Sequence, residues 1–210
     1  MSIAADGNLT LIAGQDVNAR AADVTAGEQL AVGAGRDINL MAGVQTGSAY
    51  DETHYKTKGF MSSKTTHTKT ASEFELAQAS NVMGDTVALM AGRDLSVQGS
   101  NVVGDNDVLL AANRDITIAA AAESYKDYQY EKVTKSGLGG GGGFNIGYSK
   151  QARTDWMKGE SGGFSASTVG SVGGNVTIDA GRDVGVFASS VLAQDAISQS
   201  PAGTWPSSQA

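Results

Sequence analysis

The stretch AGRDI at residues 34–38 decides the fold, because variants of it recur along the chain. It returns as AGRDL at 91–95 and AGRDV at 180–184, with weaker copies AGQDV at 13–17 and ANRDI at 112–116. The aspartates of the five copies are Asp16, Asp37, Asp94, Asp115 and Asp183. Two of the intervals between them are 21 residues and the others are 57 and 68, so the sequence predicts a 21-residue repeat interrupted by two insertions.

Apolar residues alternate with other residues on both sides of each copy. Before the aspartate the matched pairs are Leu9 and Leu11, Leu30 and Val32, Val87 and Leu89, Val108 and Leu110, and Val176 and Ile178. After it they are Val17 and Ala19, Ile38 and Leu40, Leu95 and Val97, Ile116 and Ile118, and Val184 and Val186. Alternate residues of a strand face the same side, so each copy predicts strand, turn, strand with one apolar face. A third strand is predicted at 80–85 and 100–105, with Val24 and Val191 at the same phase.

Strands that each bury only one face cannot fold alone, whereas stacked copies can. Residues 21 apart then lie above one another, about 4.8 Å per coil, and backbone groups pair with the neighbouring coils. The sequence therefore predicts an all-β fold, a parallel β-helix of about 21 residues per coil. We expect one repeat domain at 1–197, and a linker or appended tail at 198–210 that fits no repeat.

The AGRD corner has a structural interpretation. Gly14, Gly35, Gly92 and Gly181 are predicted to adopt positive φ there, and Asn113 replaces glycine in the fourth copy. Each aspartate is predicted to accept backbone N–H bonds of the turn. The preceding arginine is expected to point outward and pair with an aspartate of an adjacent coil. Five equivalent aspartates indicate a scaffold, because a catalytic acid normally occurs once.

The two insertions are expected at about 46–76 and 121–172. Each is interpreted as a β-hairpin with lysine-bearing arms and an apolar tip, the first near 59–63 and the second at the glycine-rich 137–143. Basic arms beside an apolar tip suit an anionic or membrane surface; alternatively, the hairpins lie against the shaft and bury their tips. The candidate membrane or partner contacts are Phe60, Met61, Leu138, Phe144, Lys56, Lys58 and Lys64.

Composition narrows the class of protein. A net charge of −7 argues against a nucleic-acid binder, which would carry a basic surface. The absence of cysteine excludes disulfides and thiolate chemistry. The first residues lack the basic start and apolar block of a signal peptide, and the repeats begin almost at once, so we expect a piece of a longer protein.

No catalytic residue, metal site or cofactor is predicted. The run GLGGGGGF at 137–144 lacks the Lys-Ser/Thr pair and the strand-to-helix context of a phosphate loop. His54 and His67, the only histidines, lie on opposite arms of the first hairpin, but two histidines without a defined third ligand favour solvated strand residues over a zinc site. The 21-residue spacing does not fit the nine-residue calcium-binding rolls, although GDNDV at 104–108 is similar to their turns.

The elements GNLTLIAGQDVN, AGRDINLMAG, SNVVGDNDVLLAANRDITIAAA and GGNVTIDAGRDV, with the insertion KSGLGGGGGFNIGYSK, resemble haemagglutinin repeats. Such repeats occur in filamentous-haemagglutinin-like exoproteins of Gram-negative two-partner secretion systems. The chain is most similar to the second repeat region of contact-dependent growth inhibition (CdiA-type) toxins, over about residues 5–195. The resemblance also implies a right-handed β-helix.

This resemblance implies a secreted, cell-surface protein that an outer-membrane transporter exports. In the toxin branch, the region would engage the outer membrane or a surface component of the target cell and help pass a C-terminal toxin. The toxin and receptor-binding regions of the family lie outside the segment, so we expect no nucleic-acid or small-molecule substrate here. A passive adhesin shaft and a carbohydrate-active β-helix enzyme are the alternative functions.

Overall fold

The structure, a computed structural model, describes residues 1–141 and 145–201. Two compact units can be distinguished. Met1–Gln45, Leu76–Glu123 and Gly163–Ala210 form the first, which we call the shaft, and Thr46–Glu75 with Ser124–Gly162 form the second, the hairpin sheet. Across the described residues, no helix is long and apolar enough to cross a membrane.

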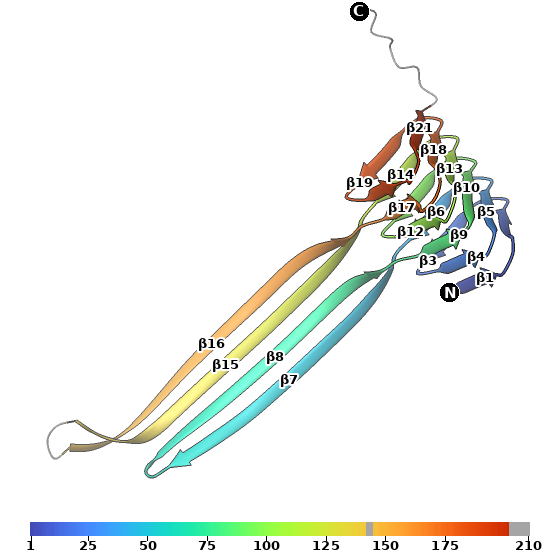
Figure 1. Cartoon of the computed structure of the whole chain (residues 1–210). Coiled ribbons are helices and arrows are strands. Elements are labelled where there is room, and N and C mark those ends of the chain that lie inside the picture. The colour runs from blue at the N-terminus through green and yellow to red at the C-terminus, as the bar shows by residue number, and fades with distance from the viewer. Residues whose placement is uncertain (142–144, 202–210) are drawn as a thin grey trace, which may run out of the picture. The chain divides into compact units, whose positions relative to one another are not determined.

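Three parallel sheets build the shaft, and successive coils add one strand to each (Figure 1). The first sheet has the order β1 (Ser2–Ala5), β4 (Asp23–Ala26), β9 (Asn81–Gly84), β12 (Asn101–Gly104), β17 (Thr168–Ser171) and β20 (Ser190–Leu192). The second is β2 (Leu9–Ala13), β5 (Gln29–Ala34), β10 (Thr86–Ala91), β13 (Val108–Ala112), β18 (Val176–Ala180) and β21 (Ile197–Pro201). The third is β19 (Val184–Phe187), β14 (Ile116–Ala119), β11 (Leu95–Gln98), β6 (Ile38–Met41) and β3 (Val17–Arg20). Because strands of successive coils pair in parallel, the predicted parallel β-helix is confirmed.

The register of the sheets follows the repeat. Leu9 pairs with Leu30, and Val87 with Val108, each 21 residues apart. The same register continues after each insertion, because Leu30 pairs with Val87 and Val108 pairs with Val176. The third strand forms a similar row of paired valines: Val24, Val82, Val102, Val169 and Val191.

The apolar ladders fill the interior of the shaft. Leu30, Leu89, Leu110 and Ile178 are fully buried in a single cluster to which all three sheets contribute. Each such side chain contributes about 2 kcal/mol by leaving water. Leu11 in β2, a strand that pairs only with β5, is partly buried against the same cluster. The alternation read from the sequence therefore identifies the core.

The glycines of the AGRD corner serve close stacking. Gly14, Gly35, Gly92 and Gly181 do not have positive φ angles, so that prediction was wrong, as it was for Asn113. A Cβ atom added at Gly35 would lie 2.3 Å from the carbonyl oxygen of Gly14 in the preceding coil. At Gly92 the same approach to the Gly35 oxygen is 2.3 Å, and at Gly181 the approach to Asn113 is 2.1 Å. At Gly35, Gly92 and Gly181 glycine favours close stacking, because a Cβ would press on the backbone of the preceding coil; the fourth copy nevertheless accommodates Asn113 at the equivalent position.

Within the shaft, positive φ occurs at a different corner, where the chain passes from the third sheet to the first, for example between β3 and β4. Ala21 has a φ of 45°, Gly99 of 55° and Ala188 of 48°. Two of these residues carry a Cβ, which makes the left-handed conformation costly. The surrounding coil therefore determines this backbone more strongly than the local sequence does.

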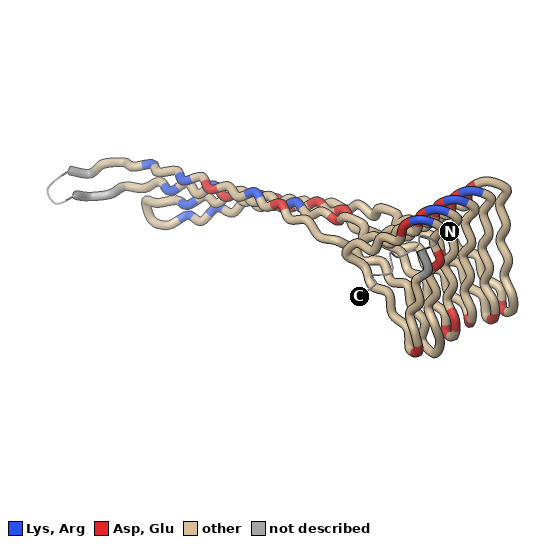
Figure 2. The backbone as a smooth tube through the Cα atoms, turned by 90° about the horizontal axis from the view of Figure 1, so that it is seen from above, with Lys and Arg blue, Asp and Glu red and all other residues tan. Residues whose placement is uncertain are grey.

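A ladder of arginine–aspartate pairs runs along the AGRD corner, as the red and blue row on the coils in Figure 2 shows. Nε of Arg36 donates to Oδ1 of Asp16 at 3.0 Å, and its Nη2 donates to Oδ2 at 2.6 Å. The same fork joins Arg93 to Asp37, Arg114 to Asp94 and Arg182 to Asp115. The predicted pairing between adjacent coils is thus confirmed.

The carboxylates of the ladder also bind backbone, but in the next coil. The N–H of Asp37 donates to Oδ1 of Asp16 at 3.2 Å, and the N–H of Asp94 donates to Asp37 in the same way. The prediction that each aspartate caps its own turn is corrected accordingly. Hydrogen bonds from the paired arginines lower the pKa of the Asp16, Asp37 and Asp115 carboxyls. Asp183, the last aspartate of the row, has a side chain that is 82% exposed.

A row of buried serines, which was not predicted, lies beside the first sheet, directly before β9, β12 and β17. Ser80, Ser100 and Ser167 are fully buried. The hydroxyl of Ser100 accepts a bond from the Ser80 N–H at 3.3 Å, and that of Ser167 accepts one from the Ser100 N–H at 3.1 Å. Each hydroxyl also donates to a backbone carbonyl, for example Ser80 to Met41 at 2.8 Å. Every side chain is satisfied, so burial of these polar groups is tolerated.

The four long strands form one antiparallel sheet in the order β16, β15, β8 and β7. They are β7 (Gly43–Gly59), β8 (Ser62–Gln78), β15 (Ala121–Gly141) and β16 (Asn145–Ser165). The insertions were predicted as separate hairpins, whereas β8 and β15 pair from Ser124 opposite Glu75 to Gly137 opposite Ser62. The expected second insertion also extends past β17, whose Thr168 pairs with Asn101 in the shaft.

Candidate functional site

The two units differ in net charge. The hairpin sheet contains ten Lys and Arg against eight Asp and Glu, a balance of +2, whereas the remaining residues contain five against 14, a balance of −9. All nine lysines of the chain lie in the hairpin sheet. A basic unit within an acidic chain is a candidate for binding an anionic surface.

The basic character concentrates toward the hairpin tips. No acidic residue occurs between residues 53 and 72 or between 132 and 154 of the sequence. These two segments carry Lys56, Lys58, Lys64, Lys69, Lys132, Lys135, Lys150 and Arg153. In a chain with a net charge of −7, this arrangement creates a local positive potential at the ends of the sheet.

The strand pairing places two of these lysines directly opposite each other. Lys64 of β8 faces Lys135 of β15, and both are exposed. The next pair, Ser63 and Ser136, joins the strands through a hydroxyl–hydroxyl bond of 3.0 Å. Like charges on paired strands destabilise a sheet. An anionic partner would relieve this repulsion.

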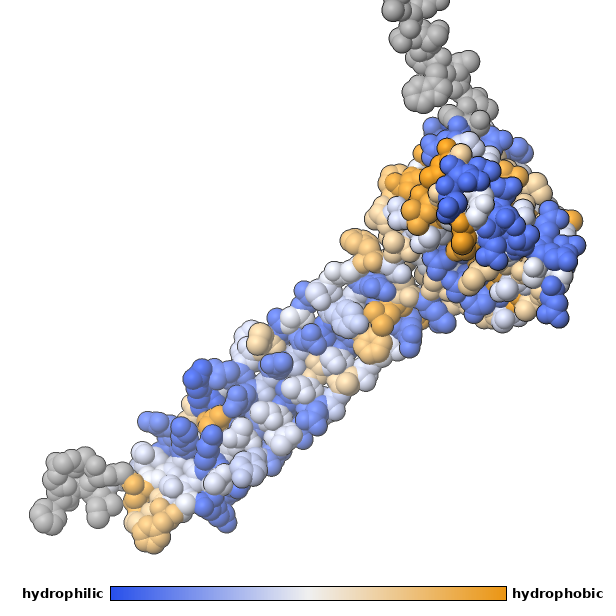
Figure 3. Space-filling model, viewed as in Figure 1, coloured by the Kyte–Doolittle hydropathy of each residue, from blue (hydrophilic) through white to orange (hydrophobic). Residues whose placement is uncertain are grey.

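The first tip presents large apolar side chains to solvent. Phe60 is 94% exposed, and Met61, at a φ of 61°, is 54% exposed. On the second hairpin, Leu138 is 44% exposed, while Phe144 lies outside the described residues. Figure 3 shows apolar side chains at the end of a largely hydrophilic unit. None of the described residues of the hairpin sheet is buried, so the sheet has no core of its own.

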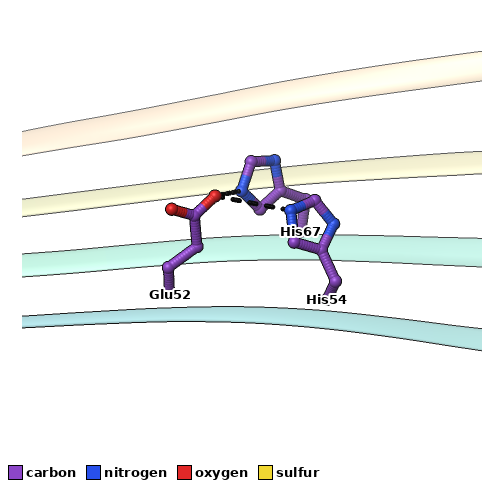
Figure 4. Close-up of side chains that lie close together, drawn as sticks. All are labelled: Glu52, His54 and His67. Atoms are coloured by element: carbon purple, nitrogen blue, oxygen red, sulfur yellow. Dashed lines mark hydrogen bonds and ion pairs between the residues drawn. The ribbon is translucent and has the colours of Figure 1, made fainter.

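A cluster of polar side chains spans β7 and β8 at the beginning of the first lysine-rich segment (Figure 4). Nε2 of His67 lies 2.6 Å from Oε1 of Glu52, and Nε2 of His54 lies 3.4 Å from the same oxygen. The two imidazole rings stack with centroids 3.7 Å apart. Nζ of Lys69 lies 3.2 Å from Oε1, and the Tyr50 hydroxyl donates to Oε2 at 2.5 Å.

Glu52 is the centre of this cluster. Hydrogen bonds from Tyr50, then from His67 and Lys69, lower the pKa of its carboxyl to about 2. The hydrogen bond to Glu52 raises the pKa of both Tyr50 and Lys69. The carboxylate is therefore held in its charged form by several donors, and the three groups of Glu52, His54 and His67 could together hold a metal ion.

The structure brings Leu138 of the second hairpin beside the first tip, because its N–H donates to the carbonyl oxygen of Met61 at 3.1 Å. Lys56, Lys58 and Lys64 lie within five residues of Phe60 or Met61 in the sequence. The two histidines, predicted on opposite arms of the first hairpin, stack on each other; the His54 side chain is 62% exposed and that of His67 only 19%. Glu52 was missed, although its spacing of two residues from His54 on a predicted strand could have indicated a shared face.

Comparison with known proteins gives the following matches. A family model described as "Hemagglutinin repeat" matches residues 1–72 and 59–200. The chain is 41% identical over 198 residues to a 16S rRNA endonuclease CdiA of Enterobacter cloacae, covering 93% of the chain. It is 40% identical over 180 residues to a tRNA nuclease CdiA of Escherichia coli, covering 85% of the chain. With a deoxyribonuclease CdiA of Dickeya dadantii it shares 38% identity over 187 residues, covering 88% of the chain.

The matched region is a small part of each of these relatives. The chain spans about 6% of the length of each. Their names give three different nuclease activities, although the matched segment is similar in all three. No solved structure matches the chain.

Proposed function

The chain belongs to the hemagglutinin repeat family, and on that premise we propose that it is a non-enzymatic delivery segment of a secreted toxin exoprotein. In this proposal the shaft is a structural support that an outer-membrane transporter exports to the cell surface. The hairpin sheet engages the outer membrane of a target cell and assists the passage of a C-terminal toxin.

The relatives support the assignment to a toxin. They carry the names of different nucleases, yet all contain a segment similar to this chain. A segment shared among proteins with different activities is expected to serve a step common to all of them, such as export or delivery. We therefore place no catalytic residue in the chain.

The observation that carries the membrane role is the tip of the hairpin sheet. Phe60 is almost fully exposed at the centre of a 20-residue segment that has four lysines and no acidic residue. Peripheral membrane binding combines burial of apolar side chains with attraction between basic residues and anionic head groups. Both components are present at the tip, and no buried residue of the hairpin sheet ties it to a core of its own.

A liposome flotation assay tests this role. The wild-type chain is expected to float with vesicles rich in anionic lipid and to stay behind with neutral vesicles. The double variant Phe60→Ser with Leu138→Ser should lose most of the flotation. The matched control is Trp156→Ser on β16, since Trp156 is 68% exposed but lies outside the tip. Equal flotation of wild type and the tip variant would remove the tips from the mechanism.

Lysine variants separate the two components of binding. Replacing Lys56, Lys58 and Lys64 with glutamine should weaken flotation at low salt and reduce its dependence on ionic strength. The tip variant should keep that dependence while it binds less overall. Loss of flotation in the Trp156 control as well would point to general surface adhesion.

A passive shaft is the second candidate, as in a filamentous adhesin. It is supported by the core, whose described residues all come from the shaft. The parallel sheets therefore do not depend on the hairpin sheet for burial. In the full-length parent protein, replacing 46–75 and 124–162 with short turns should leave toxin delivery intact if the segment is only a spacer, and should abolish delivery under the leading proposal.

A further inference from the structure

We propose that Glu52, His54 and His67 form a binding site for a divalent transition-metal ion of the zinc type, which links β7 to β8. Their donors, two imidazole nitrogens and one carboxylate oxygen, are those that zinc prefers in sites with three protein ligands. This inference does not depend on membrane binding or on toxin delivery, and it replaces the expectation that the two histidines are only solvated strand residues.

The three donor atoms already converge. Both Nε2 atoms face the same oxygen of Glu52, at 2.6 Å for His67 and 3.4 Å for His54. All three lie within 4.8 Å of one another. Tetrahedral zinc binds nitrogen and oxygen at about 2.1 Å, which places its ligand atoms roughly 3.4 Å apart. The separation of His54 from Glu52 meets this value, and that of His67 from Glu52 has to open by less than about 1 Å.

The two strands place the three ligand side chains on one face of the sheet. Glu52 and His54 are two residues apart on β7, so their side chains point to one face of the sheet, and His67 reaches the same face from β8. The imidazoles stack at 3.7 Å and have to turn apart for both lone pairs to reach one ion. The His54 side chain is 62% exposed, so the contact to be given up in this rotation is its stacking on the His67 ring.

Tyr50 orients the carboxylate. Its hydroxyl donates to Oε2 of Glu52 at 2.5 Å, which leaves Oε1 directed at the two imidazoles. Polar partners of this kind, which fix a ligand through its second atom, commonly accompany metal sites. The arrangement of Tyr50 is not required for a simple ion pair with Lys69, since either oxygen would serve.

Lys69 is the competitor for the site. Its Nζ lies 3.2 Å from Oε1 of Glu52, where it supplies the positive charge that an ion would replace. Metal binding must therefore displace the ammonium group. This predicts opposite effects for two substitutions: loss of a histidine removes a ligand, whereas Lys69→Gln removes a competing cation.

The ion would clamp the two arms of the first hairpin, because its ligands come from both strands. Three protein ligands leave at least one coordination position for water or for a donor from another molecule. The chain has no cysteine and therefore no disulfide, so such a clamp would add a metal-mediated link to the hydrogen bonds and the Lys69–Glu52 ion pair that already join the two strands.

Isothermal titration with zinc chloride, on the full chain without an affinity tag, tests the site. Wild type is expected to bind one equivalent saturably and to gain thermal stability in the hairpin. His54→Ala and His67→Ala should each abolish saturable binding, and Tyr50→Phe should weaken it about tenfold. Lys69→Gln should bind more tightly than wild type. Cobalt(II), used as a spectroscopic probe, should give the intense visible absorption of a tetrahedral site with wild type and not with either histidine variant.

Three results would overturn the proposal. Zinc binding that persists in the His54→Ala/His67→Ala double variant would assign the ion to acidic surface groups. Loss of affinity in Lys69→Gln would show that the cluster is an ion-pair network organised by the lysine. Equal binding of calcium and zinc would exclude a nitrogen-liganded site. Circular dichroism of each variant, unchanged from wild type, ensures that a lost site is not a lost fold.

Discussion

The shaft and the hairpin sheet are both built from β-strands, but only the shaft buries a core. In the shaft, parallel strands turn their apolar residues into a shared interior, where Leu30, Leu89 and Leu110 are fully buried. In the hairpin sheet, antiparallel strands of up to 21 residues leave every described residue at least partly accessible. The difference shows that backbone pairing alone can define a sheet, whereas a stable core needs a second apolar layer.

The cations differ in the same way. The shaft contains five arginines and no lysine, and four of the arginines form two-point bonds with aspartates of the preceding coil. The planar guanidinium suits this fixed geometry, because it donates to both carboxylate oxygens at once. The flexible lysines of the hairpin sheet suit attraction to a surface without a fixed register. Arginine thus orders the shaft internally, whereas the lysines of the hairpin sheet would serve contact under the proposed function.

The largest difference is expected from truncating an apolar side chain. Leu110→Ala should destabilise the shaft by about 3 kcal/mol, because it removes a fully buried side chain from a packed core. Val133→Ala, on β15 of the hairpin sheet, should cost less than about 1 kcal/mol. Urea unfolding of both variants measures the contrast. Similar losses would mean that the hairpin sheet has a core that its exposure does not reveal.

A pair of glycine substitutions tests the close stacking of the coils. Gly92→Ala should destabilise the shaft by about 2 kcal/mol, since its Cβ would meet the carbonyl oxygen of Gly35 and force the coils apart. Gly14→Ala, at the equivalent place in the first coil, has no atom within 4 Å of the added Cβ and should change little. Thermal unfolding of the two variants compares them. If both proved neutral, glycine at this corner would not be required for stacking.

Acidification should act on the shaft through its aspartate row. Arginine hydrogen bonds lower the pKa of Asp16, Asp37 and Asp115 in the folded chain. Their contribution is therefore complete above the unfolded pKa of about 3.9, and it is lost as the pH falls through that value toward the folded pKa. We expect Tm to fall by several degrees between pH 5 and about pH 2.5. Arg93→Gln should lower Tm at pH 7 and reduce this pH dependence, whereas Asp183→Asn, at the open end of the row, should do neither.

More of the shaft than of the hairpin sheet could be predicted from the sequence. The 21-residue period, the apolar ladders and the pairing of Arg36 with Asp16 all follow from one repeated unit, so each copy checks the others. The row of buried serines was not predicted, because serine is typical of loops. A signal was present, since Ser80, Ser100 and Ser167 each stand two positions before a ladder valine. Glycine at the corner was interpreted through φ, because the approach of a neighbouring coil is not visible within one copy.

The hairpin sheet has no such internal check. Its strands occur once, so the pairing of β8 with β15, in which His67 faces Lys132, cannot be read from either insertion alone. The cluster around Glu52 depends on the register between β7 and β8, and an error of one residue would turn its side chains to the other face. The sequence therefore predicted which apolar and lysine residues lie near the tips, but it did not predict how the side chains of the Glu52 cluster are arranged.

The smallest effect is expected where both units hold a residue other than glycine at positive φ. Ala21 in the shaft has a φ of 45°, and Met61 at the hairpin tip has a φ of 61°. Glycine relieves roughly 1 kcal/mol of backbone strain. It also gives the unfolded chain about 0.4–1 kcal/mol more conformational entropy to lose, so the net change should stay within about 0.5 kcal/mol at either site.

The two sites should nevertheless report differently. Ala21→Gly should act on global unfolding, because its N–H bonds to Met41 within the stacked coils at 3.2 Å. Met61→Gly should act only on amide exchange of the adjoining ends of β7 and β8. A loss above about 1 kcal/mol for Ala21→Gly would mean that its methyl group contributes packing. That methyl lies where Gly43 approaches, since a Cβ added at Gly43 would come within 2.7 Å of it. Strain at this corner would then be offset by contact between coils, and the hairpin tip, which has no neighbouring coil, would show the strain alone.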